Sequence, residues 1–478
     1  MFGFDSFMQI SYILNFILII VVVFFQRKDP IVSLTWVLVF ILLPIGGLLA
    51  FLIFGLGVKR RTSGIYYGKQ VQGDALTRQL YEQMDILDTL ETKDINELDL
   101  IRYFCKYHCL YTENNSVDIL CDAREKYDLL LSDIENATES INLLYFIVRK
   151  DDIGTKIMNA LVKKANEGVK VRLLYDSFGC FFTPRKFLTS LNHTKHGKAV
   201  SFYPVNIFTL SKINHRNHRK IAVIDNKIAY LGGMNIGDEY MGLKKTKPWR
   251  DTHLRITGDA VKLLYKQFCL DWDFSARDTL SKTLENLRLD DPETHNGFLP
   301  MQIVSSGPDS PAEEIKCGMM KMIYSARHYI YIQSPYFIPD QSFRNALITA
   351  VDSGVDVRIM LPGKPDKPYV YYSSLSYLDE MLKAGVKVYL YNGFIHSKTI
   401  TVDDKLATIG TTNIDIRSFQ LHFETNAFFY SPETAVKCRE IYEEDIEESY
   451  CLTLEEYEKR PFKTRVREGF FRLFSPIM

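Results

Sequence analysis

The stretch His218-Arg-Lys-Ile-Ala-Val-Ile-Asp225 returns later in the chain as His396-Ser-Lys-Thr-Ile-Thr-Val-Asp403. Each copy reads His, any residue, Lys, four further residues and Asp, and each continues to a Gly and an Asn at matched distances. These residues are Gly232, Asn235, Gly410 and Asn413. One His-x-Lys pair predicts little, because surface residues without a role give the same pattern. Two copies with matched spacing predict that residues from both form one composite site.

The duplication extends beyond this motif. Residues Asn159–Leu173 match Asn345–Ile359 without a gap, and both segments read as an amphipathic helix, a glycine stop and a β-branched strand. Short β-rich runs follow the histidines at Ile221–Ile224 and Thr399–Val402. Alternating helices and strands in each half predict an α/β fold with two similar lobes.

Within each motif the His and the Lys stand two residues apart at the entry of a predicted strand. Side chains at positions i and i+2 of a strand point to the same face. We therefore expect His218 and Lys220 to address one pocket, as His396 and Lys398 do.

Two histidines, two lysines and two asparagines form a set suited to a phosphodiester. Lys220, Lys398, Asn235 and Asn413 are expected to hold the phosphate oxygens and offset their charge. One histidine, if neutral, attacks phosphorus to form a covalent intermediate, and the other protonates the leaving alcohol. Because lysines supply the positive charge, we expect neither a metal nor another cofactor.

Four acids are candidates to complete this set. Asp251 and Glu424 each open a further predicted strand, and they are expected to hydrogen-bond the histidine ring nitrogen opposite the reacting one. In the first half this pairs His218 with Asp251. Asp225 and Asp403 complete the motif and are counted with the catalytic residues, with turn or strand-end positions as the alternative.

The N-terminus has the composition of a membrane hairpin. Phe7–Phe25 is uncharged, a polar break follows, and Ile31–Val58 is again uncharged and can cross with tilt or with a kink at Pro44. A cleavable signal peptide fits less well, since no positive segment precedes the first run. The pairs Arg27-Lys28 and Lys59-Arg60-Arg61 favour a cytoplasmic catalytic part by a narrow margin.

Charge and cysteine content exclude several other classes. Lysine plus arginine equals aspartate plus glutamate at 58 each, so no basic field points to nucleic acid. The scattered cysteines predict reduced thiols, and Cys105 and Cys109 lack a second pair at zinc-ligand spacing. The C-terminal stretch from Arg460 interleaves basic and aromatic residues, which suits an anionic membrane surface or, equally, a helix packed on the domain.

The predicted organisation has five parts. They are a transmembrane hairpin (1–60), a connector (61–115), a first lobe (116–290), a second lobe (291–459) and a basic-aromatic tail (460–478).

At these motifs the chain resembles the phospholipase D superfamily and, within it, the bacterial cardiolipin synthases. The resemblance rests on the doubled His-x-Lys-x4-Asp pattern, on the N-terminal hairpin, and on segments such as Gly232-Gly-Met-Asn-Ile-Gly237, Trp249-Arg-Asp-Thr-His253 and Gln333-Ser-Pro-Tyr-Phe337. It implies two phospholipase D-like lobes meeting face to face, each a sheet between helices, with the site at their interface. It also implies that His218 is the nucleophile and His396 the acid and base, which sequence symmetry alone cannot assign.

The resemblance further implies the reaction. Two phosphatidylglycerol molecules would give cardiolipin and glycerol through a phosphohistidine intermediate, at the bacterial cell membrane. The alternative is a membrane-anchored phospholipase D that hydrolyses phospholipids or transfers them to other alcohols. A nuclease of the same superfamily is disfavoured by the balanced charge and the two predicted membrane spans. A non-catalytic membrane scaffold predicts that His218→Ala and His396→Ala leave activity in lipid extracts unchanged.

Overall fold

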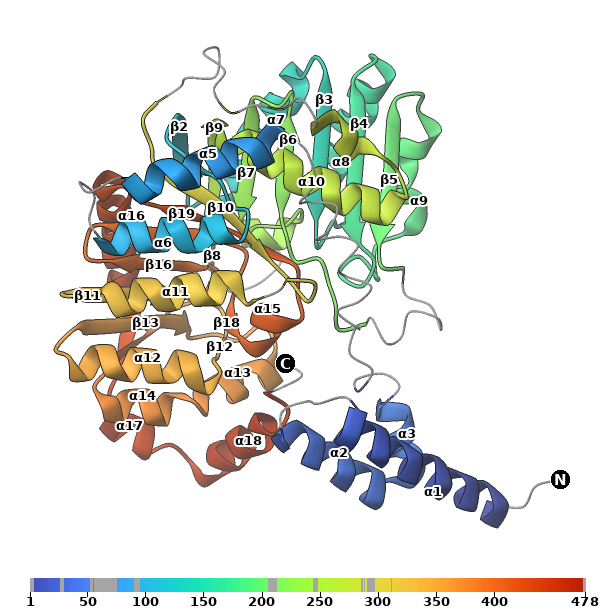
Figure 1. Cartoon of the computed structure of the whole chain (residues 1–478), viewed down its shortest axis with the longest axis vertical. Coiled ribbons are helices and arrows are strands. Elements are labelled where there is room, and N and C mark those ends of the chain that lie inside the picture. Colours follow the sequence, from blue (N-terminus) through green and yellow to red (C-terminus); the bar gives the residue numbers. More distant parts are fainter. Residues whose placement is uncertain are drawn as a thin grey trace.

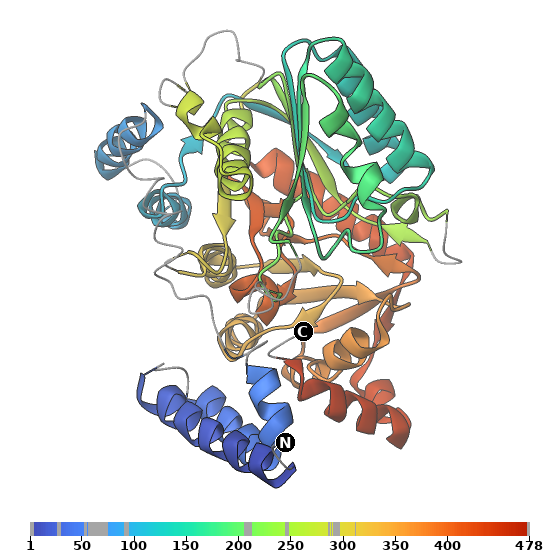
Figure 2. The same ribbon diagram turned by 90° about the vertical axis from the view of Figure 1, so that its right-hand side faces the viewer.

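The computed structural model describes residues 4–25, 30–51, 55, 75–89, 95–204, 213–243, 248–284, 287, 289, 297–310 and 312–475. These ranges form two α/β lobes, a first lobe drawn mostly in green and a second in yellow to red (Figure 1). The N-terminal helices, in dark blue, lie apart from both lobes, at the same end as the C-terminal helix α18 (Figures 1 and 2).

The first lobe is built on a seven-stranded sheet with the order β2-β9-β7-β6-β3-β4-β5. Helices α7 and α8 cover one face, while α10 covers the other and joins it to the core of the second lobe. The strands are β2 (Asn115–Leu120), β3 (Ser140–Tyr145), β4 (Lys170–Asp176), β5 (Gly197–Phe202), β6 (Ile221–Ile224), β7 (Ile228–Gly232) and β9 (His253–Gly258). The helices are α7 (Ala123–Asn136), α8 (Asp152–Asn166), α9 (Arg185–Leu188) and α10 (Ala260–Ala276), with short 3-10 turns η3 (Ser190–His193), η5 (Asp238–Met241) and η6 (Leu280–Leu284).

The second lobe has a nine-stranded sheet with the order β1-β10-β19-β17-β16-β11-β13-β14-β20. Its strands are β1 (Tyr111–Thr112), β10 (Met301–Ser306), β11 (Tyr329–Gln333), β13 (Asp356–Pro362), β14 (Lys387–Tyr391), β16 (Thr399–Val402), β17 (Leu406–Gly410), β19 (Glu424–Phe429) and β20 (Ser449–Leu452). Its helices are α11 (Glu314–Ser325), α12 (Gln341–Asp352), α13 (Pro368–Leu375), α14 (Leu378–Ala384), α15 (Ile416–Gln420), α16 (Pro432–Glu447), α17 (Leu454–Glu458) and α18 (Phe462–Arg472). Four short strands pair outside the two sheets: β8 (Trp249–Arg250), β12 (Phe337–Ile338), β15 (Phe394–Ile395) and β18 (Ile414–Asp415).

The two sheets share one strand order around the repeated motif. The run β9-β7-β6-β3-β4-β5 of the first lobe corresponds to β19-β17-β16-β11-β13-β14 of the second. The duplicated helices end as expected, because Gly168 (φ +106°) and Gly354 (φ +87°) adopt the left-handed conformation that glycine allows after α8 and α12. The α/β fold class predicted from the duplication is therefore found in both lobes.

The predicted connector is more closely joined to the second lobe than its polar sequence indicates. Helices α5 (Ala75–Thr89) and α6 (Ile95–Lys106) contribute Leu80 and Phe104 to the core of that lobe. The Phe104 ring lies 4.6 Å from that of Phe428 on β19. Strand β1 then pairs with β10, so the end of the connector completes the sheet of the second lobe. Residues 61–74 and 90–94 lie outside the described ranges.

The predicted hairpin of two spans is confirmed for its first helix only. In the described residues one helix, Met8–Phe25, is long and apolar enough to cross a membrane; it comprises α1 (Phe4–Ile20) and a π-helical turn, η1 (Val21–Phe25). The second predicted span is divided at Leu43 into α2 (Pro30–Leu42) and α3 (Pro44–Ala50). The kink considered at Pro44 is thus a break between two helices.

The chain folds back on itself at this break. The ring of Phe51 lies 5.1 Å from that of Trp36, which brings the end of α3 back beside α2. Pro44 has no N–H for a continuous helix, and Asn15 of α1 donates hydrogen bonds to the carbonyls of Phe40 (3.1 Å) and Pro44 (2.8 Å). A polar side chain thus satisfies carbonyls at the break.

The C-terminal tail forms a helix packed on the second lobe, one of the two alternatives considered for it. Helix α18 packs on α13, with the rings of Phe471 and Tyr372 stacked 6.2 Å apart, and Arg460 forms an ion pair with Glu468 at 2.9 Å. Its outer side leaves Phe462 and Leu473 exposed. The helix is anchored to the second lobe and still presents apolar side chains to its surroundings.

Candidate active site

The two repeated histidines open onto one cavity between the lobes. His218 lies three residues before β6 of the first lobe, and His396 lies between β15 and β16 of the second. Both line a cavity of about 420 Å³. Side chains from both lobes complete its wall, among them Arg149, Arg216, Asn235, Tyr240, Trp249, Asp366, Lys367, Asn413, Asp415, Arg417 and His422. The composite site expected from the doubled motif is thus a feature of the structure.

Each histidine is held by an acid from the opposite lobe. Nδ1 of His218 lies 3.0 Å from Oε1 and 3.2 Å from Oε2 of Glu424, and Nδ1 of His396 lies 2.7 Å from Oδ2 of Asp251. Both carboxylates are buried. The expected pairing of His218 with Asp251 inside its own half is therefore wrong. An Nδ1–H donated to a carboxylate leaves Nε2 with its lone pair.

Backbone pairing between the lobes fixes this exchange of partners. His218 donates its N–H to the carbonyl of Phe423 at 2.9 Å, and His396 donates its own to that of Arg250 at 2.6 Å. Strands β15 and β8 run parallel at the second of these contacts. Each histidine is thereby placed beside the residue that precedes the acid of the other lobe.

The lysines of the motifs are buried beneath the histidines. Nζ of Lys220 donates to the carbonyl of His218, and Nζ of Lys398 to that of His396, both at 2.5 Å. Burial lowers the pKa of Lys220 to about 7 and that of Lys398 to about 8, against the opposing effect of the nearby acids. An anion bound nearby would therefore favour the protonated, positively charged form of both amines.

Burial and the nearby lysines favour the neutral form of both histidines. Burial, then the charge of Lys220, holds the pKa of His218 well below its usual range. Burial and Lys398 lower the pKa of His396 to about 4, although Asp251 opposes the change. A neutral imidazole is the form required of a nucleophile.

The two asparagines line the cavity at equivalent positions with different contacts. Asn235 accepts a hydrogen bond from the N–H of Ile147 (3.0 Å) and donates one to the Tyr240 hydroxyl (2.7 Å). Asn413 follows β17, and its Oδ1 is buried without a hydrogen-bond partner among the described residues. Both amides stand where a bound phosphate could meet them.

The structure places Asp225 and Asp403 away from the cavity. Each is the first residue of a three-residue hairpin loop, with φ of +51° and +54° respectively. Asp225 accepts hydrogen bonds at 2.8 Å from the N–H groups of Thr138, Glu139 and Ser140. Asp403 does the same for residues 327–329. The catalytic grouping of these two acids is thus corrected: they join β6 to β3 and β16 to β11 at the strand ends opposite the histidines.

We expect Asp225→Ala to lower the free energy of unfolding by about 1–3 kcal/mol, because it leaves several backbone donors unpaired. Although burial raises the pKa of Asp225, hydrogen bonds from Ser140, Thr138 and Glu139 keep it below its usual value. The carboxylate therefore stabilises the fold above about pH 4 and ceases to do so as pH falls through its folded-state pKa. Thermal unfolding measured from pH 3 to 7 checks this. If the variant lost turnover while its stability stayed unchanged, Asp225 would again count as a catalytic residue.

The lysine pKa values predict how pH affects anion binding. Above pH 7 to 8 the two lysines beneath the histidines become increasingly neutral, whereas a bound phosphodiester favours their charged form. The affinity for glycerophosphoglycerol should fall at least about tenfold from pH 6 to pH 8, and further by pH 9. Calorimetry checks this, and Lys220→Met should show a shallower dependence. A constant affinity would contradict the lysine assignment.

Among the cavity residues that were not singled out from the sequence, two lie beside the histidines. The ring of Trp249 lies 5.5 Å from that of His396, and the ring of His422 lies 5.5 Å from that of His218. Their positions in the sequence were a possible signal, since each stands two residues before an expected acid, Asp251 or Glu424. The sequence does not show that each acid pairs with the histidine of the other lobe, so it could not show which histidine each of the two residues lies beside.

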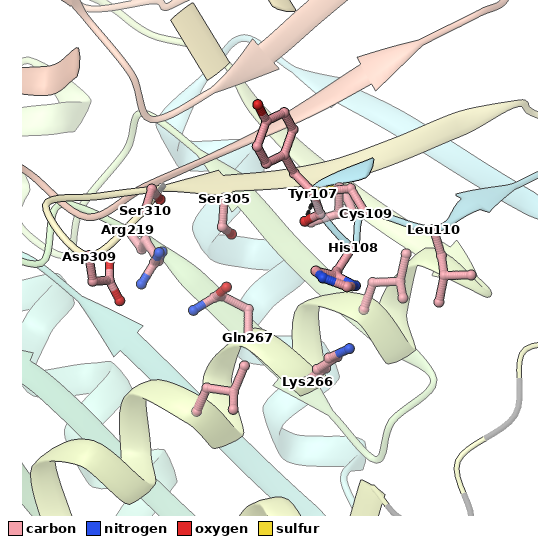
Figure 3. Close-up of a pocket in the computed structure, with 13 residues that line it drawn as sticks. Tyr107, His108, Cys109, Leu110, Arg219, Lys266, Gln267, Ser305, Asp309 and Ser310 are labelled. Atoms are coloured by element: carbon pink, nitrogen blue, oxygen red, sulfur yellow. Dashed lines mark hydrogen bonds between the residues drawn. The ribbon is translucent and has the colours of Figure 1, made fainter. Parts of the chain in front are cut away.

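A smaller cavity of about 60 Å³ lies elsewhere, between α10 and β10 (Figure 3). Its labelled side chains include Lys266, Gln267 and Asp309, and none of the repeated histidines lines it. Arg219, also on its wall, forms a buried ion pair with Asp271 at 2.7 Å. None of the residues of the two repeated motifs that were predicted to form the site lines this cavity.

Known proteins are similar to this chain in sequence along nearly its whole length. The family model described as "Cardiolipin synthase, PLD-like domain" matches residues 130–249 and 319–446, one segment in each lobe. The chain is 42% identical to a cardiolipin synthase of Oceanobacillus iheyensis and 42% identical to the major cardiolipin synthase ClsA of Bacillus subtilis, over 98% of this chain and 98% of each relative.

Solved structures agree on the fold. The crystal structure of a phosphatidylserine synthase from Haemophilus influenzae superposes with a TM-score of 0.60 at 16% identity, over 77% of this chain and 97% of that one. At this identity the likeness bears on the fold alone. From the family match and from relatives that align along nearly the whole chain, we conclude that the chain belongs to the bacterial cardiolipin synthases of the phospholipase D superfamily.

Proposed function

We propose that this enzyme transfers a phosphatidyl group from one phosphatidylglycerol to another, releasing glycerol and forming cardiolipin. One observation carries the proposal: two buried histidines, each hydrogen-bonded to an acid of the opposite lobe, open onto one cavity. Covalent transfer needs a nucleophile on one side of phosphorus and an acid on the other. The relatives named as cardiolipin synthases supply the substrate class.

In the first step, Nε2 of His218 attacks phosphorus and the P–O bond to glycerol breaks. Glu424 accepts the Nδ1–H of His218 and offsets the positive charge that the ring gains. His396, protonated in the loaded site, gives its proton to the glycerol oxygen. Asp251, at 2.7 Å, stabilises that protonated form.

In the second step, the hydroxyl of another phosphatidylglycerol attacks the phosphohistidine. Neutral His396 takes the hydroxyl proton, the P–N bond breaks, and His218 regains its lone pair. Lys220 and Lys398 offset the phosphate charge in both steps, and Asn235 and Asn413 donate to its oxygens. One phosphodiester replaces another, so the reaction is near neutral in free energy and needs no nucleotide.

The assignment of the two histidines has structural support. Both rings carry a carboxylate at Nδ1, yet the shorter contact belongs to His396 (2.7 Å against 3.0 Å for His218). A closer carboxylate favours the protonated ring, which suits the acid. His218, whose pKa is held well below the usual range by burial and by the nearby Lys220, suits the nucleophile.

The cavity mouth supports a position against the bilayer. Phe178 and Tyr369 line the cavity and are 47% and 44% exposed, and Phe181 and Phe182, on the same loop as Phe178, are 64% and 86% exposed. Aromatic residues favour the membrane interface. A lipid alcohol would then reach the phosphohistidine more readily than bulk water does.

The N-terminus and α18 would hold this face at the membrane. Helix Met8–Phe25 has the length of a span, and α18 leaves Phe462 and Leu473 exposed among basic residues. The charges of Lys59, Arg60 and Arg61 favour lobes on the cytoplasmic side. Because the chain breaks at Leu43, α2 and α3 fold back beside α1. We therefore propose one continuous membrane span, Met8–Phe25.

Product analysis tests the function. Purified enzyme with phosphatidylglycerol vesicles should produce cardiolipin and glycerol in equal amounts, without divalent metal and in the presence of a chelator. Release of phosphatidic acid without cardiolipin would identify a hydrolase and overturn the proposal. A variant with His193→Ala, an exposed residue outside the cavity, is a matched control and should retain full activity.

A further inference from the structure

The proposed mechanism leaves one histidine of the cavity without a role. His422 lies two residues before Glu424, and its ring is 5.5 Å from that of His218. Neither ring nitrogen makes a hydrogen bond with the residues that the structure describes. A largely buried imidazole without a hydrogen-bond partner, facing a cavity, has two nitrogens available to a ligand.

Glu424 lies between the two histidines. Its Oε1 is 3.0 Å from Nδ1 of His218 and 3.7 Å from Nδ1 of His422. One ligand atom from each of the three residues lies within 4.8 Å of the other two. A tetrahedral zinc ion with bonds of about 2.0–2.1 Å holds its ligand atoms about 3.4 Å apart.

We propose that His218, His422 and Glu424 form a binding site for a zinc ion. Two imidazoles and one carboxylate are a ligand set that zinc uses in proteins, and the cavity leaves the fourth position open to water. Small rotations of the three side chains suffice, since the separations of 3.0 Å and 3.7 Å from Oε1 of Glu424 lie on either side of the required one. The cavity itself is the entry path.

The other half of the site lacks this arrangement. The residue two positions before Asp251 is Trp249, and its ring lies 5.5 Å from that of His396. An indole has no lone pair to offer a metal. The pair of His396 and Asp251 therefore has no third ligand at the equivalent position, so the proposal predicts one zinc ion per chain.

Zinc at this site would inhibit the enzyme. The ion binds the lone pair of Nδ1 of His218, so the ring proton moves through solvent from Nδ1 to Nε2. Nε2 then carries a hydrogen and cannot attack phosphorus. This consequence rests on the proposed role of His218, whereas the binding of zinc does not.

Metal binding is tested first, on the untagged full-length protein in detergent, with cobalt(II) as a spectroscopic probe for zinc. We expect one equivalent of cobalt to give the intense visible absorption of a four-coordinate site, and zinc to displace it. His422→Asn should weaken binding at least about tenfold, whereas His193→Asn should leave it unchanged. Absence of the four-coordinate spectrum, or its persistence in His422→Asn, would overturn the site.

Inhibition is tested second, with each variant compared to its own metal-free rate because His422 lines the cavity. Zinc should inhibit the wild type and the His193→Asn variant at the concentration that displaces cobalt, and a chelator should restore the rate. His422→Asn should require at least about tenfold more zinc. Tight binding without inhibition would overturn the inhibitory role and leave the site. If the protein makes no cardiolipin at all, the proposed function fails and the spectroscopic result still decides on the site.

Discussion

His396→Ala should release one equivalent of nitrophenolate from a phosphatidyl nitrophenol and then stop, whereas His218→Ala should release none. Nitrophenolate leaves without protonation, so the first step requires only the nucleophile. The second step still requires a base to take the proton of the incoming alcohol, and His396→Ala lacks it. The covalent intermediate should therefore accumulate in this variant alone.

Rapid-quench measurements of nitrophenolate, with acid-labile lipid label on the protein, check this result. With phosphatidylglycerol itself, turnover should fall at least about 10³-fold in both variants, because a glycerol leaving group needs the acid as well. His193→Ala, exposed and outside the cavity, should behave as wild type. A burst in His218→Ala and none in His396→Ala would exchange the two roles, and a burst in neither would remove the covalent mechanism.

The duplication made most of the fold predictable. Matched spacing after His218 and His396 indicates two equivalent lobes, and the glycines at 168 and 354 mark the same helix end in each. Both signals are local in sequence. They describe each lobe well, because periodicity and turn preferences act over a few residues.

What lies between the lobes was not predictable in this way. Asp251 and Glu424 occupy equivalent places: His253 pairs with Gly232 across β9 and β7, and Asn426 with Gly410 across β19 and β17. Symmetry within the chain therefore gives each acid two possible partners. Only the docking of the lobes brings Glu424 to His218, and no local pattern encodes docking.

Two other differences have separate causes. Asp225 belongs to the motif by position, yet a carboxylate that accepts backbone hydrogen bonds at a turn looks the same in sequence as one in a site. The apolar run from Ile31 satisfies a length criterion, but it contains Pro44, whose effect on the helix depends on whether neighbouring side chains such as Asn15 satisfy the freed carbonyls.

The exchange of acids between the lobes predicts which step each acid affects. Glu424→Gln should slow the nitrophenolate burst by about 10²–10⁴-fold, because the amide no longer favours the Nδ1–H tautomer of His218 or offsets its charge. Asp251→Asn should leave the burst near its wild-type rate and slow the following steady state by a similar factor, because it acts through His396. Both substitutions nearly preserve side-chain volume, so the cavity keeps its shape.

Asp225→Asn, at the opposite end of β6, serves as the matched control and should change neither phase. Pairing within each half predicts the reverse, with Asp251→Asn slowing the burst, and that result would show that the acids act inside their own lobes despite the 3.0 Å and 2.7 Å contacts between the lobes.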